Sequence, residues 1–113
     1  MMLPKSTPLC YHLDVATEKA ITKRIINWIK AQPGGHAIKM TPHGDVNRGE
    51  PDIFACYHGY MVLIEVKKPD GILEPLQLAK LSKWSRAEAR AMIVTDLEPV
   101  KLLFQDIDAL VSQ

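Results

Sequence analysis

The stretch that decides the fold is PDIFACYHGYMVLIEVK, residues 51–67. It contains two candidate strands, 52–57 and 60–67, which are rich in apolar and β-branched residues and are joined by His58-Gly59. A two-residue connection of this kind is typical of a β-hairpin. Because both faces of the two runs are apolar, we expect the hairpin to lie in a sheet that is covered on both sides.

The segments around the hairpin predict further helices and strands. A helix is expected from its N-cap Thr17 to the break at 33–35, and a short strand at 36–41. After the hairpin, a helix is expected over 75–87, with Leu78, Ala79, Leu81 and Trp84 on its apolar side, and a strand over 91–95. A last helix carries an apolar stripe made of Val100, Leu103, Phe104, Ile107, Leu110 and Val111. The expected order is α-β-β-β-α-β-α, an α/β fold.

The composition is that of one globular domain. The chain has 113 residues, of which 47% are hydrophobic and 24% charged, and this length suits a single core. We expect 1–16 to form an N-terminal arm and 17–113 to form the domain. No secretory leader is evident, so Cys10 and Cys56 are predicted to be free thiols in the cytoplasm. The longest apolar run, 60–64, is far too short to span a membrane.

The charge is distributed unevenly along the chain. There are 14 basic and 13 acidic residues, a formal net charge of +1, so composition alone offers no basic footprint for nucleic acid. However, 13 basic and 9 acidic residues lie in 1–90, whereas 1 basic and 4 acidic residues lie in 91–113. This pattern permits contact with nucleic acid without requiring it.

The predicted hairpin brings two carboxylates together. A two-residue turn pairs Tyr57 with Tyr60. Counted outward, the same register pairs Asp52 with Glu65. Like charges opposed on neighbouring strands are destabilising unless something neutralises them, and a bound cation would do so. Lys67 shares a face with Glu65 two residues along the strand, so we expect the two acids and this lysine to converge at one end of the hairpin.

Two acids and a lysine around a hard cation indicate phosphodiester chemistry. Carboxylate oxygens suit Mg²⁺, which also binds phosphate oxygens. Such an ion can polarise a phosphodiester and lower the pKa of a bound water. Lys67 would then stabilise the charge of the transition state or orient the attacking water. A Pro-Asp pair or an acid-X-lysine triplet alone is common, so the hypothesis depends on their joint spacing.

These residues carry a resemblance to a known family. PD at 51–52, EVK at 65–67, Gln77 downstream and Glu18 on the preceding helix resemble the signature of PD-(D/E)XK nucleases. More narrowly, the strings GEPDI and IEVK resemble the VRR-NUC branch, which includes small phage and bacterial proteins similar to Holliday-junction resolvases. The resemblance covers about residues 17–97. It implies a restriction-endonuclease-like core with a mixed sheet flanked by helices.

The resemblance also implies roles for the central residues. Asp52 and Glu65 would bind Mg²⁺, for which Mn²⁺ could substitute. The backbone carbonyl of Val66 would also reach the metal, and Lys67 would be catalytic.

Three more residues stand near this motif. The resemblance implies that Glu18, acting on the metal directly or through water, and Gln77 support catalysis. Glu18 also lies on the buried stripe of its helix, pointing toward the core, but could simply favour the positive end of the helix dipole. Gln77 could equally be a surface residue.

Glu50 departs from the family pattern, and it could add a ligand or pair with Lys67. The segment 88–91 lacks the glycine that the family pattern has before the last strand.

Together, these features predict a metal-dependent, structure-selective DNA endonuclease. It would resolve four-way (Holliday) junctions as a homodimer in the cytoplasm of a bacterial or phage-infected cell. The residues expected to meet DNA phosphates are the loop 42–50 with Arg48, and Lys68, Lys80, Lys83 and Arg86. Two alternatives remain open: a catalytically silent DNA-binding or assembly module, and a nuclease acting on flaps or duplex. A sequence-specific restriction-type enzyme would need extra recognition elements.

Overall fold

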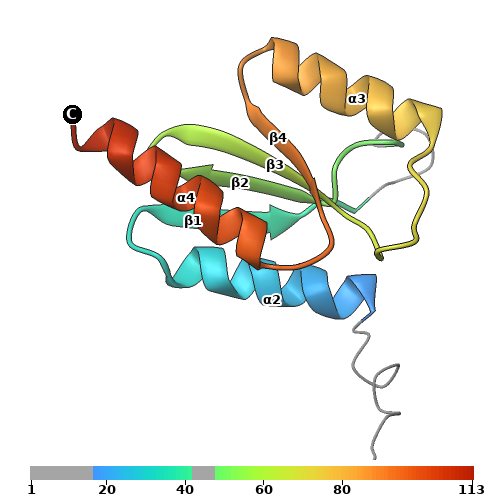
Figure 1. Cartoon of the computed structure of the whole chain (residues 1–113), viewed down its shortest axis with the longest axis horizontal. Coiled ribbons are helices and arrows are strands. Elements are labelled where there is room, and N and C mark those ends of the chain that lie inside the picture. The colour runs from blue at the N-terminus through green and yellow to red at the C-terminus, as the bar shows by residue number, and fades with distance from the viewer. Residues whose placement is uncertain (1–16, 42–47) are drawn as a thin grey trace, which may run out of the picture.

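The computed structural model describes residues 17–41 and 48–113 (Figure 1). The elements in chain order are α2 (Glu18–Ala31), β1 (Gly35–Lys39), β2 (Ile53–Tyr57), β3 (Tyr60–Val66), α3 (Pro75–Arg86), β4 (Arg90–Val94) and α4 (Glu98–Val111). The predicted order is therefore confirmed, with boundaries that differ by one or two residues. The predicted arm, 1–16, and most of the loop before Asp52 lie outside the described residues.

The four strands form one mixed sheet in the order β1-β2-β3-β4. The pairs β1–β2 and β2–β3 are antiparallel, whereas β4 runs parallel to β3. A parallel pair needs a crossover connection, and α3 provides it. Within the hairpin, Tyr57 lies opposite Tyr60 and Ile53 opposite Ile64. This is the predicted register.

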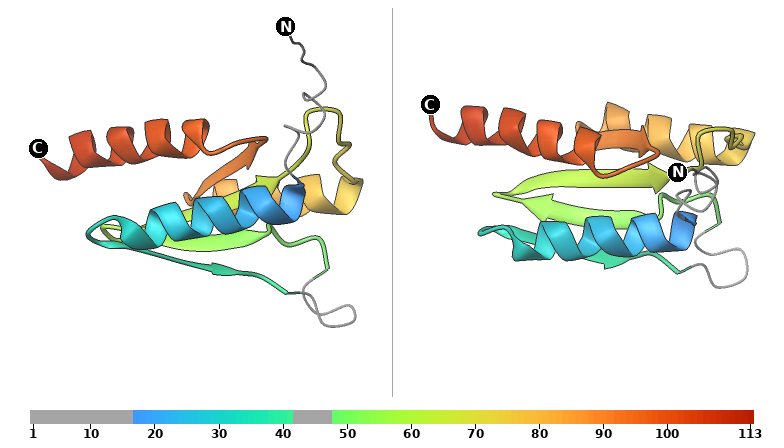
Figure 2. Two further views of the ribbon diagram at one scale, coloured as in Figure 1. Left: turned by 90° about the horizontal axis from the view of Figure 1, so that it is seen from below. Right: turned by 60° about the horizontal axis from the view of Figure 1, so that its bottom comes forward.

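Helices cover both faces of the sheet, α2 and α4 on one side and α3 on the other (Figures 1 and 2). On α2, three isoleucines at four-residue spacing face the sheet, and Trp28 packs against Phe104 of α4. The side chains of the main core come from alternate strand positions and from α4: Ile53, Ala55, Tyr57, Val62, Ile64, Val66, Val100, Phe104 and Ile107. The core thus lies between the sheet and the α2–α4 layer.

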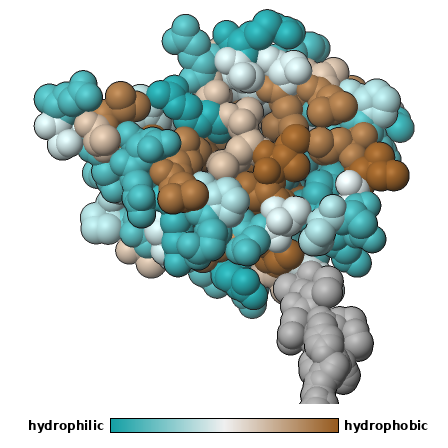
Figure 3. All heavy atoms as spheres, in the orientation of Figure 1, coloured by the Kyte–Doolittle hydropathy of each residue, from teal (hydrophilic) through white to brown (hydrophobic). Residues whose placement is uncertain are grey.

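The second face of the sheet is only partly covered, so the expectation of full coverage is wrong. Leu63 is buried there, but Met61 is 38% and Ile38 51% exposed. A helix is about 10 Å wide, whereas four strands at 4.8 Å spacing span about 14 Å, so α3 alone leaves strands open. Of the four residues predicted for its apolar side, only Leu81 is buried. On the opposite side of the molecule, which carries α2 and α4 and faces the viewer in Figure 3, apolar surface is also exposed between α3 and α4.

Two local features bear on the sequence expectations. The turn between α3 and β4 is made by Glu88, whose φ is 72°. It adopts the left-handed conformation that a glycine would adopt more readily, at a cost of about 1–2 kcal/mol. Cys56 is a free, exposed thiol as predicted, and Cys10 lies outside the described residues. Within 17–41 and 48–113, no helix is long and apolar enough to cross a membrane.

Candidate active site

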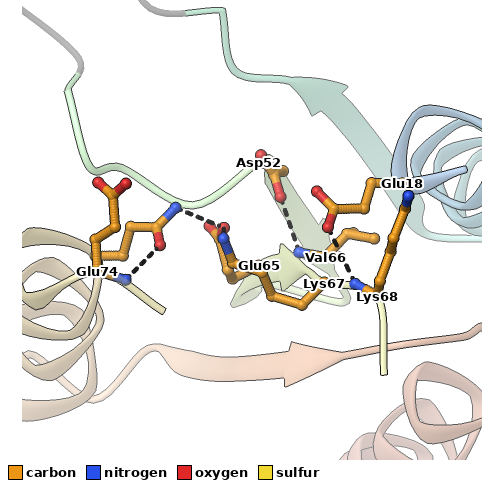
Figure 4. A network of polar contacts seen from close by, with 8 residues as sticks. Glu18, Asp52, Glu65, Val66, Lys67, Lys68 and Glu74 are labelled. Atoms are coloured by element: carbon orange, nitrogen blue, oxygen red, sulfur yellow. Dashed lines mark hydrogen bonds and ion pairs between the residues drawn. The ribbon is translucent and has the colours of Figure 1, made fainter. Parts of the chain in front are cut away.

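The predicted site residues meet at one end of the sheet, where four elements begin or end (Figure 4). Glu18 begins α2, and Asp52 immediately precedes β2. Glu65 is the second-last residue of β3, and Lys67 directly follows that strand. Gln77 lies in the first turn of α3. The topology thus brings together residues that are up to 59 positions apart in the chain.

Asp52 is held by backbone on both sides. The N–H of Val66 donates to Oδ2 of Asp52 at 2.8 Å, and the N–H of Met40 donates to its carbonyl at the same distance. Pro51 is fully buried just before it. The carboxylate therefore takes up a strand N–H beyond the end of the regular β2–β3 ladder, and this fixes it beside Glu65.

Glu65 is a buried carboxyl with few partners. It is only 2% exposed, and its Oε2 accepts a hydrogen bond from Gln77 Nε2 at 3.0 Å. The ammonium of Lys67 lies 3.7 Å from the same oxygen. Burial, and next the negative charge of Asp52, raises the pKa of Glu65 to about 7; Lys67 opposes this rise and Glu18 adds to it. The site therefore favours either a proton or a bound cation at this carboxyl.

The pKa of Asp52 is raised in the same way. Burial is the main cause, the hydrogen bond from Val66 opposes it, and the charge of Glu18 adds to it. Lys67 and Lys39 lower the pKa. In Figure 4 the Asp52 carboxylate lies between those of Glu65 and Glu18. The three acids thus form one electrostatically crowded group.

Glu18 reaches this group, but not from the core. It is half-buried at the first position of α2, and its Oε2 accepts from the N–H of Lys68 at 3.0 Å. The expectation that it points into the core is therefore wrong, because the buried stripe of the helix starts one turn later, at Ile21. Glu18 joins the helix to the segment that follows β3, next to the site.

The position of Gln77 favours a site role over a surface role. Its Oε1 accepts from the N–H of Glu74 at 2.9 Å, which closes a capping box at the start of α3. Its Nε2 donates to Glu65. The hydrogen bond to the N-terminus of α3 therefore fixes the Gln77 amide in an orientation in which it donates to the buried carboxyl.

Glu50 does not pair with Lys67, one of the two roles expected for it. Its Oε1 accepts from Trp84 Nε1 at 2.9 Å, and its Oε2 lies 3.4 Å from the ammonium of Lys80. These partners are four residues apart on α3 and so share one face of that helix. Glu50 thus ties the segment before Asp52 to the helix that carries Gln77. The sequence signal was the departure of Glu50 from the family pattern.

The donor set fits a hard divalent cation. Carboxylate and carbonyl oxygens are the ligands that Mg²⁺ and Mn²⁺ prefer. Burial is the main cause of the raised pKa of Asp52 and of Glu65, and the charges of neighbouring acids add to it; a bound cation would offset both effects. Among residues 17–41 and 48–113, no group of three His, Cys, Asp or Glu side chains is arranged closely enough to enclose an ion. The two acids and the carbonyl of Val66 are the residues that would hold it.

Fold and site together define a class of small α/β domains in which helices flank a four-stranded mixed sheet and charged side chains gather at one end of it. Acids lie at the open end of the central hairpin, and a lysine lies two positions after the second acid.

Solved structures place the fold more narrowly. One, described as a VRR_NUC domain, matches with a TM-score of 0.63 at 22% identity, over 80% of this chain and 97% of its own. Another, described as a VRR_NUC domain protein, matches with a TM-score of 0.62 at 20% identity, over 80% and 87%. The chain therefore has the VRR-NUC fold, as its sequence motifs predicted. No family model and no curated protein matches the sequence.

Proposed function

We propose that this chain is a metal-dependent DNA endonuclease that hydrolyses phosphodiester bonds and selects its substrate by structure. The observation that carries the proposal is the buried Glu65 carboxyl, placed beside Asp52 and within 3.7 Å of the Lys67 ammonium. Such a perturbed acid next to a lysine is typical of a catalytic site. The fold that the chain shares with VRR_NUC domains supports a nuclease.

Each residue has a distinct task in this proposal. Bound Mg²⁺ or Mn²⁺, held by Asp52, Glu65 and the carbonyl of Val66, would supply a Lewis acid and a water of lowered pKa. Lys67 places a positive charge beside the reacting phosphate, where negative charge grows in the transition state. Gln77 keeps the Glu65 carboxylate in one orientation, since its Nε2 donates to Oε2.

We further propose that the chain acts on four-way junctions as a homodimer. Two sites related by a two-fold axis suit symmetric incision of such a junction, and one core of this size spans little DNA. The uncovered face of the sheet supports a self-association surface. It holds an apolar groove of about 390 Å³ lined by His36, Ile38, Phe54, Ala55, Cys56 and Met61.

The test is cleavage of labelled four-way junctions, flaps, linear duplex and single strands with Mg²⁺, Mn²⁺ or EDTA. The wild type should make paired nicks in the junction only with metal. Asp52→Ala and Lys67→Ala should each lower the rate at least about 100-fold. Circular dichroism and thermal melting of both variants check that they fold.

Other outcomes would change the proposal. Cutting in EDTA, or undiminished cutting by Asp52→Ala, would contradict the metal site. Junction binding without cutting by the wild type would favour a silent DNA-binding module, and preferential cutting of flaps or duplex would replace the substrate. Light scattering at the monomer mass, with and without junction DNA, would contradict the homodimer.

A further inference from the structure

A second cluster of positive charge lies beside the candidate active site. Lys19 and Lys23 on α2 and Lys39 at the end of β1 line a groove of about 260 Å³, together with Thr22 and Ile26. The three lysines are exposed. These three ammonium groups have no ion-pair partner among residues 17–41 and 48–113.

The groove starts at the site. Lys19 follows Glu18 directly, and Lys39 precedes Met40, whose N–H bonds to the carbonyl of Asp52. The charge of Lys39 also acts on the Asp52 carboxyl, where it opposes the rise in pKa that burial causes. A ligand lying in the groove would thus have one end next to the carboxylates.

The groove lies on the flank of α2 that faces away from α4. Trp28 contacts Phe104 of α4, and Lys19, nine positions earlier, lies on the opposite side of the helix at 100° per residue. In Figures 1 and 2 that flank borders β1 at the edge of the sheet. The acidic C-terminal segment, residues 96–108, lies on the α4 side of α2. A polyanion in the groove would therefore not be repelled by it at close range.

The arrangement is unfavourable without a partner. Lys19 and Lys23 are like charges at four-residue spacing on a helix, which costs a few tenths of a kcal/mol. They are about 6 Å apart along the axis, a span over which one DNA strand presents about two phosphates. A phosphate backbone would convert this repulsion into attraction.

We propose that Lys19, Lys23 and Lys39 form a phosphate-binding groove that guides one strand of the DNA substrate to the carboxylates. This rests on the proposed nuclease function and adds the path of the strand to it. It also replaces the surface of α3 expected from the sequence. On α3, Lys80 is paired with Glu50. Lys83 and Arg86 lie in the last turn, where basic residues favour the negative end of the helix dipole.

The test is equilibrium binding of a fluorescent four-way junction in EDTA, between 50 and 200 mM NaCl, with cleavage in Mg²⁺ measured in parallel. The groove variant is Lys19→Gln/Lys23→Gln/Lys39→Gln. The matched control removes three positive charges elsewhere: Arg24→Gln/Arg90→Gln/Lys101→Gln. A third variant tests the rival surface: Lys83→Gln/Arg86→Gln. A fourth keeps the charge of the groove: Lys19→Arg/Lys23→Arg/Lys39→Arg.

The groove variant should bind about tenfold or more weakly at 100 mM salt. Its plot of log K against log salt should be shallower by about 2 to 3, since each lost phosphate contact removes about 0.9. The control and the arginine variant should stay within about twofold of the wild type.

Equal losses in the groove variant and the control, or a larger loss in the rival variant, would overturn the groove. A wild type that binds and cuts the junction while the groove variant matches it would overturn the groove and leave the nuclease. A wild type that neither binds nor cuts would overturn both.

Discussion

The two ends of the β2–β3 hairpin are stabilised in opposite ways. At the turn end, Tyr57 is buried, its ring stacks on Phe104 at 4.1 Å, and its hydroxyl donates to Asp108 at 2.5 Å. At the open end, Glu65 is buried beside Asp52. Burial, and next the charge of Asp52, raises the pKa of Glu65, and burial together with the charge of Glu18 raises the pKa of Asp52. One strand pair thus carries a satisfied polar group at one end and an unresolved charge conflict at the other. Buried acids of like charge are normally avoided in a protein core, and an exception of this kind is expected at a functional site.

The largest expected effect comes from removing the conflict. Glu65→Gln keeps the shape of the side chain and removes its charge, so cleavage in Mg²⁺ should fall at least about 100-fold. The same variant should be more stable than the wild type in metal-free buffer at pH 8, as measured by urea denaturation. A variant that loses both activity and stability would show that Glu65 is structural.

The Glu65 carboxyl should make the free energy of unfolding depend on pH. The folded pKa of Glu65, about 7, lies above its ordinary value of 4.5, so the folded state holds the proton more tightly. Its contribution is fully present below pH 4.5 and is lost as pH rises through 7. At about 1.4 kcal/mol per pKa unit, the loss is roughly 3 kcal/mol. The difference in unfolding free energy between the wild type and Glu65→Gln should change by this amount between pH 4.5 and 8.

The open end of the hairpin could be predicted from the sequence because its geometry follows from counting. A two-residue turn and the alternation of apolar residues set the register, and the register places Asp52 across from Glu65. The bond from Val66 to Asp52 could not be predicted in this way, because Asp52 lies just beyond the ladder. The contact of Glu50 with Trp84 joins residues 34 positions apart and depends on how α3 crosses the sheet. Local sequence patterns do not determine the angle at which α3 crosses the sheet.

A smaller effect is expected from the contact that sequence patterns did not predict. Glu50→Ala leaves the indole N–H of Trp84 without its acceptor and frees the segment before Asp52 from α3. This hydrogen bond is partly buried, so its loss costs about 1 kcal/mol. We therefore expect reduced stability and a kcat about tenfold lower, with KM little changed. Glu50→Gln keeps an acceptor for Trp84 and should recover most of kcat. Equal losses of kcat in both variants would show that the pair with Lys80 matters more than the bond to Trp84.

The smallest effect is expected at the turn end. Tyr57→Phe keeps the ring stack on Phe104 but loses the hydrogen bond to Asp108, so the unfolding free energy should fall by about 1–2 kcal/mol. That bond, and next burial and the charge of Asp108, raises the pKa of Tyr57 above 10, so the contribution of the hydroxyl is present below pH 10 and lost above it. Tyr60→Phe, across the turn, keeps its ring under the guanidinium of Arg90 and is the matched control. Cleavage should be unchanged in both variants, because the turn and the carboxylates lie at opposite ends of the hairpin. Loss of cleavage in Tyr57→Phe at unchanged stability would mean that the two ends are coupled, and the contrast between them would fail.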